Sequence, residues 1–149
     1  MIAGDAIRIG SHVPDWRAAV RAAGDALVDC GATTTAYTDE MIATVEQLGP
    51  YIVIAPGIAL AHSRPSPAVL RAGISLVTLA QPVDFGHRQN DPVQLVVGLA
   101  APDDDGHVTA LATLAEFLAD EGRRTALLSA SGPASIRQMI GDYEGGSAT

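Results

Sequence analysis

A histidine at position 62 follows an apolar segment that is interrupted by glycine and proline. Residues 57–61 (Gly-Ile-Ala-Leu-Ala) lead directly into His62, and the polar, stiff exit Ser63-Arg64-Pro65 follows. A neutral imidazole is a nucleophile, and its ordinary pKa of about 6.5 keeps most of it neutral near neutral pH. With Arg64 two residues further on, this pattern is suited to accepting a phosphoryl group. The alternative is a structural histidine whose ring is hydrogen-bonded at a strand end and takes no part in chemistry.

A second histidine, His107, comes after the acidic loop Asp103–Gly106 and opens a predicted helix. It is either a solvent-facing residue at the helix start or a hydrogen-bond donor there, where free backbone N–H groups also favour an anion. His62 and His107 each follow a predicted core strand. Adjacent strands would bring the two imidazoles together.

The remaining candidate residues favour no other chemistry. His12 and His87 fall in predicted loops, and the four histidines lack the spacing of metal ligands. The acidic run at 103–105 lacks the ligand pattern of a calcium loop. Cys30 is predicted to be a small core residue near a helix end. We therefore expect no metal and no bound cofactor.

The composition predicts one compact domain over residues 1–149. The 149 residues are 48% hydrophobic and 17% charged, which argues against disorder. All nine basic residues are arginine and the net charge is −8, so no basic stripe exists to bind nucleic acid. The longest apolar run, residues 93–101, is too short to cross a bilayer. We expect a cytoplasmic protein without direct membrane insertion.

Apolar periodicity predicts an α/β sandwich, in which a mixed central sheet carries helices on both faces. Asp15 is a suitable N-cap for a helix over 16–29 with Gly31 as its stop signal, and a second helix is expected over 38–48, ended by Gly49-Pro50. Strands are expected at 51–54, 58–60, 73–80 and 93–101, with a short edge strand at 82–85 and a helical turn at 66–71. Further helices are expected from His107 onward, over 121–129 and over 134–143.

Several separated blocks resemble the IIA components of the bacterial sugar phosphotransferase system, in the fructose–mannitol class. The phosphorylation-site signature of that family is similar to Gln47-x6-Ile54-Ala55-x2-Ile58-Ala59-Leu60-Ala61-His62. The blocks 49–57, 82–86 and 90–93 are most similar to the ascorbate-type branch. The blocks occur in the right order, and the resemblance extends over nearly the whole chain.

The resemblance implies an EIIA type-2-like sandwich and a phosphotransferase component that works through a phosphohistidine. His62 would take the phosphoryl group from the phosphocarrier protein HPr and pass it to an EIIB component, and through it to a membrane EIIC. The second histidine of the family falls on His107, which would orient His62 and hydrogen-bond the phosphoryl oxygens.

This chain departs from the family pattern at three positions. Ala61 stands where proline usually precedes the active histidine, and Ser63 stands where glycine or alanine is common. Glu46 occupies the position at which mannitol-type members carry an arginine. We expect Arg64 to supply the missing positive charge.

Two other functions are compatible with the same residues. In a regulatory EIIA-like protein, the phosphorylation state would control a protein partner without onward transfer. In an inactive copy, the chain would only bind its partners, and Ala61 is the feature that suggests this. A gene for EIIB or EIIC beside this one would favour transport, whereas an isolated gene would favour regulation.

Overall fold

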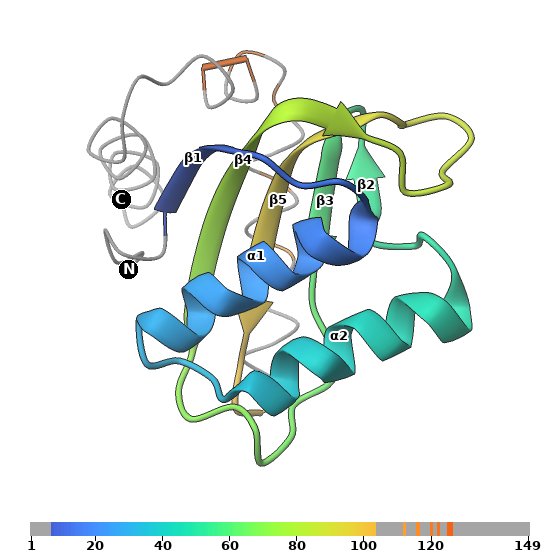
Figure 1. Ribbon diagram of the computed structural model, residues 1–149. Helices are drawn as coiled ribbons and strands as arrows, with labels where there is room; N and C mark the ends of the chain where they lie inside the picture. Colours follow the sequence, from blue (N-terminus) through green and yellow to red (C-terminus); the bar gives the residue numbers. More distant parts are fainter. Residues whose placement is uncertain are drawn as a thin grey trace.

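A mixed five-stranded sheet forms the centre of the fold (Figure 1). The computed structural model describes residues 7–103 and the isolated positions 112, 116, 120, 122, 125 and 126. Along the chain the elements are β1 (Ile7–Ser11), α1 (Trp16–Asp29), α2 (Thr35–Leu48), β2 (Val53–Ala55), β3 (Ile58–Ala61), β4 (Gly73–Val83) and β5 (Val93–Ala100).

The order of the strands places β3 and β5 side by side and parallel. The sheet runs β1-β4-β5-β3-β2. β1 pairs with β4 in parallel, whereas β4 with β5 and β2 with β3 are antiparallel. The predicted α/β class with a mixed central sheet is therefore confirmed. Because β3 and β5 are parallel, their carboxyl ends meet at the same edge of the sheet, where open α/β sheets bind their ligands.

Helix α1 has the predicted bounds. The side chain of Asp15 accepts a hydrogen bond from the backbone N–H of Ala18 at 2.9 Å, so it caps the helix as its residue type suggests. Gly31, with φ of +81°, takes the left-handed conformation that lets the chain leave the helix. The apolar spacing of residues 16–29 predicts that Val20 and Leu27 lie on one face, and both are fully buried in the core. α1 lies across β4 and β5 (Figure 1).

Helix α2 begins three residues earlier than the predicted start at Thr38. Thr34 is its extended N-cap residue, and Tyr37 in the first turn is buried. The apolar spacing of this helix predicts inward positions for Met41 and Leu48. Met41 is buried, but Leu48 is 69% exposed, so the prediction was wrong for Leu48. Leu48 is the last residue of the helix, where Gly49 turns the chain away with φ of +87°.

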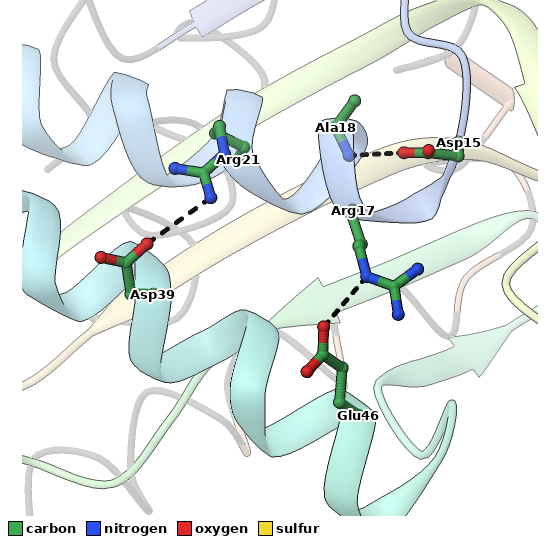
Figure 2. A network of polar contacts seen from close by, with 6 residues as sticks. All are labelled: Asp15, Arg17, Ala18, Arg21, Asp39 and Glu46. Atoms are coloured by element: carbon green, nitrogen blue, oxygen red, sulfur yellow. Dashed lines mark hydrogen bonds and ion pairs between the residues drawn. The ribbon is translucent and has the colours of Figure 1, made fainter.

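Close approach and two ion pairs join α1 to α2 (Figure 2). A Cβ atom on Gly24 would lie 2.3 Å from the hydroxyl oxygen of Thr38, so glycine permits this helix contact. Arg17 pairs with Glu46 at 2.9 Å, and Arg21 with Asp39 at 3.5 Å. Exposed pairs of this kind contribute about 0–1 kcal/mol, so packing accounts for most of the contact.

The strands that lead to the predicted site are buried, as their continuous apolar character suggests. All four residues of β3 are buried, and so are seven of the eight in β5. The prediction of a separate edge strand at 82–85 was wrong, because Val83 still belongs to β4 and pairs with Val93. The segment 66–71 forms a turn with one bridge between Val69 and Thr33, where a helical turn was expected.

The helices predicted from His107 onward lie outside the described residues. Figure 1 shows α1 and α2 on one side of the sheet, and helices on the other face stay a prediction. None of the helices in the described part of the chain has the length and apolar character needed to cross a membrane.

Candidate functional site

His62 lies at the end of β3, where the chain passes from a buried strand to a partly exposed segment. The register pairs Ala61, the residue before it, with Gly98 of β5. The imidazole is therefore placed at the sheet edge at which the two parallel strands end. Its side chain is only partly buried, so a macromolecular partner can approach it.

A backbone carbonyl fixes the orientation and the tautomer of the His62 ring. Nδ1 lies 2.8 Å from the carbonyl oxygen of Leu60. A carbonyl oxygen can only accept, so Nδ1 must carry the proton and donate it to Leu60. In the neutral ring, Nε2 then carries the lone pair and is the nucleophilic nitrogen.

Tyr51 forms one wall of the His62 site. The two rings meet edge to face, with centroids 5.5 Å apart and an interplanar angle of 82°. This geometry is favourable for aromatic pairs and restricts rotation of the imidazole. Tyr51 is 40% exposed, and its partial burial raises the pKa of its phenol.

The segment after His62 is bound to helix α2. The hydroxyl oxygen of Tyr37 accepts a hydrogen bond from the backbone N–H of Ser63 at 3.0 Å. Thr44 donates its hydroxyl proton to the carbonyl of Glu40, so at 3.3 Å it accepts from the Ser63 hydroxyl. Ser66 donates to the carboxylate of Glu40 at 2.9 Å. These bonds hold the backbone beside His62 in one conformation.

Burial raises the pKa of Tyr37 from 10.0 to about 12. The unfolded chain therefore loses this proton first, so the stability from the neutral phenol is complete below pH 10 and is lost as the pH rises toward 12. We expect a loss of up to about 3 kcal/mol in the free energy of unfolding over this range. Urea unfolding at a series of alkaline pH values measures it. Tyr37→Phe should flatten the slope, and an unchanged slope in that variant would contradict the assignment.

The structure places the other predicted site residues unequally. Arg64 lies on the exposed exit, two residues after His62. Glu46, at the position of the family's upstream arginine, faces α1 and pairs with Arg17 (Figure 2). His107 lies outside the described residues, so its predicted approach to His62 stays a prediction.

The two loop histidines have different surroundings. His12 is exposed. Nδ1 of His87 accepts hydrogen bonds from the backbone N–H groups of Gln89 and Asn90, so this ring helps to shape the loop between β4 and β5. That loop lies beside Gly57 at the start of β3, because Gly57 donates to the carbonyl of Asn90 at 2.9 Å. It is thus at the opposite end of β3 from His62.

Sequence reasoning missed Tyr37 and Tyr51 as neighbours of the site. Tyr37 fell just outside the predicted helix, although a tyrosine beside an apolar helical stripe is often buried and then needs a partner for its hydroxyl. Tyr51 lies in the block 49–57 that resembles the ascorbate-type branch, but only the antiparallel pairing of β2 with β3 brings it next to His62.

The fold, with a histidine at the ends of parallel strands, is that of a phosphotransferase component. A model of the family "Phosphoenolpyruvate-dependent sugar phosphotransferase system, EIIA 2" matches residues 1–143, and the chain belongs to this family. Among its curated relatives is the ascorbate-specific PTS system EIIA component of Escherichia coli K12, which is 42% identical over 101 residues. The aligned part covers 68% of this chain and 66% of that relative.

Solved structures of PTS IIA proteins share the fold over nearly the whole chain. A PTS IIA protein (PtxA) from Streptococcus mutans superposes with a TM-score of 0.84 at 29% identity, covering 97% of this chain and 96% of the other. The complex of enzyme IIA and phosphorylated enzyme IIB for mannitol from Escherichia coli gives 0.82 at 22% identity, covering 95% and 98%. The second likeness concerns the fold alone.

Proposed function

We propose that this chain is the phosphocarrier EIIA component of a sugar phosphotransferase system, with His62 as the residue that is phosphorylated. The observation that carries the proposal is the hydrogen bond from Nδ1 of His62 to the Leu60 carbonyl, which presents Nε2 as the nucleophile at the strand ends. The family match over residues 1–143 supports the further proposal that residues 1–149 form a single EIIA domain.

Phosphoryl transfer to His62 needs little beyond position and charge compensation. The lone pair of Nε2 attacks the phosphorus of phospho-HPr, and the donor's P–N bond breaks with its electron pair returning to the donor nitrogen. The His62 ring gains positive charge as the new N–P bond forms. Nδ1 keeps its proton throughout, and the Leu60 carbonyl stabilises the charged ring through the 2.8 Å bond.

We propose that the phosphoryl group then passes to an EIIB component and, through it, to sugar carried by a membrane EIIC. A mannitol enzyme IIA with the same fold is found in complex with a phosphorylated enzyme IIB. The ascorbate-specific relatives support ascorbate as the sugar. The partly exposed imidazole suits a site that two partners must reach in turn.

Arg64 and His107 are the groups that we propose to stabilise the phosphoryl oxygens. Arg64 is exposed and close in sequence, so its flexible guanidinium can reach an oxygen once the group is bound. His107 has the role that the family resemblance implies, namely orienting His62 and donating a hydrogen bond to the phosphoryl group.

Replacing His107 with alanine is expected to leave His62 phosphorylated, but about tenfold or more slowly, because one hydrogen-bond donor to the developing charge is removed. Rapid-quench measurement of labelling by phospho-HPr gives the rate. Transfer at the wild-type rate would remove His107 from the mechanism.

A reconstituted relay tests the proposed function. Enzyme I, HPr and phosphoenolpyruvate are mixed with this protein, and a purified ascorbate-type EIIB is added after labelling. We expect the label to move from this protein to EIIB within the mixing time. Label that stays on this protein would favour a regulatory role, and no label from a competent donor would favour the inactive copy.

A further inference from the structure

The pairing of β3 with β5 stops at a hydroxyl group. Ala61 pairs with Gly98, so the next pair in register would join His62 to Leu99. At that point the side chain of Tyr37, from α2, takes the place of the strand contact. Its hydroxyl lies 3.0 Å from the nitrogen of Ser63 and 2.8 Å from the carbonyl oxygen of Leu99.

The Tyr37 hydroxyl both accepts and donates a hydrogen bond. It accepts from the N–H of Ser63 and has one proton, for which the carbonyls of Leu99 and Ser63, at 2.8 and 3.1 Å, compete. Tyr37 is only 1% exposed, so water cannot replace these bonds. The Tyr37 hydroxyl therefore bridges the two strands where they diverge.

We propose that Tyr37 is a positioning residue for His62: its buried hydroxyl holds β3 and β5 at the separation that presents Nε2 of the imidazole to the phosphoryl donor. This inference rests on the proposed function of His62. It adds a residue on a different element, which acts on His62 through the backbone by its hydrogen bond to the Ser63 amide.

The geometry explains how the hydroxyl acts on the ring. Before His62, the backbone is fixed by the sheet through Ala61, and after it the backbone is fixed by Tyr37 through the amide of Ser63. The bond from Nδ1 to the Leu60 carbonyl closes over only two residues of chain, so its geometry depends on the backbone conformation at Ala61 and His62. Release of the Ser63 amide lets the peptide after His62 rotate and weakens that bond.

Tyr37→Phe removes the hydroxyl and keeps the ring that fills the core. We expect the rate constant for phosphorylation at saturating phospho-HPr to fall about tenfold, with the KM for phospho-HPr within about twofold of wild type, because the buried hydroxyl cannot touch the donor. In ¹⁵N NMR of histidine-labelled protein, the His62 ring should change from one tautomer with the proton on Nδ1 to a mixture of two.

Ser75→Ala is the matched control for lost stability. Ser75 is fully buried in β4 and donates its hydroxyl to the carbonyl of Ala23 at 2.8 Å. This variant also loses one buried hydroxyl bond, but on the part of the sheet that faces α1. We expect it to unfold at a lower temperature and to keep both the wild-type transfer rate and the single His62 tautomer.

The results of these experiments distinguish a failure of the positioning role of Tyr37 from a failure of the proposed function. A wild-type protein that takes no label overturns the proposed function, whereas the tautomer measurement needs no phosphorylation and still tests Tyr37. A labelled wild type with an unchanged rate and tautomer in Tyr37→Phe overturns the positioning role alone. If Tyr37→Phe does not fold, Thr44→Val, which frees the Ser63 hydroxyl, should shift the same tautomer ratio in the same direction. An unshifted ratio in that variant would overturn the inference.

Discussion

Replacing His62 with alanine is expected to abolish acceptance of the phosphoryl group while the fold survives. Alanine removes the nucleophilic Nε2 and leaves no other group at that position to form the bond. The side chain is only partly buried and lies after the last residue of β3, so its removal leaves the buried strand and the two helices in place. Incubation with enzyme I, HPr and phosphoenolpyruvate, followed by detection of acid-labile phosphate on the protein, measures the effect.

His12→Ala is the control for loss of a histidine as such. His12 is exposed in the segment between β1 and α1, and this variant should take label at the wild-type rate. Stoichiometric label on His62→Ala would mean that another residue is the acceptor, and the assignment of the site would be wrong.

Gly98→Ala is expected to destabilise the protein by about 2–4 kcal/mol. A Cβ at this position would lie 2.3 Å from the Ser75 hydroxyl and 3.3 Å from the Leu27 side chain. The hydroxyl must then rotate away and give up its buried bond to Ala23, or α1 must move off the sheet. Urea unfolding measures the change. Because Gly98 pairs with Ala61, displacement of β5 would also disturb the strand that carries His62.

A double-mutant cycle identifies the cause of that loss. In Ser75→Ala the atom that would clash is gone, so adding Gly98→Ala should cost clearly less than it costs in the wild type. Equal costs in the two backgrounds would show that the Ser75 contact is not responsible.

The parts of the fold that the sequence predicted well are those fixed by local signals. Helix α1 has its N-cap at Asp15, its apolar stripe and its stop at Gly31 all within one stretch, and its bounds were predicted correctly. The start of α2 was placed three residues too late, although Thr34 at its N-cap is a residue type favoured at that position. The long β4 was cut short because Pro82 suggested a break, whereas the strand continues to Val83 with a register shift.

In the candidate site, too, the features predicted correctly are those that depend on neighbouring residues in the chain. His62 was placed at a strand end by the apolar residues that precede it, and the resemblance to a known signature implied that it is phosphorylated. The bridge made by Tyr37 depends on contacts across 26 and 62 residues of sequence, which no local pattern encodes. Only the meeting of α2 with the ends of β3 and β5 defines them.

The most direct test of the account is to identify the phosphorylated atom. Protein labelled with ¹⁵N-histidine is phosphorylated through HPr, and phosphorus coupling to the ring nitrogens is read by NMR. We predict a single phosphohistidine at His62, with the phosphoryl group on Nε2 and the proton retained on Nδ1. Phosphate on Nδ1, or on any other residue, would contradict the geometry of the Leu60 hydrogen bond as the basis of the site.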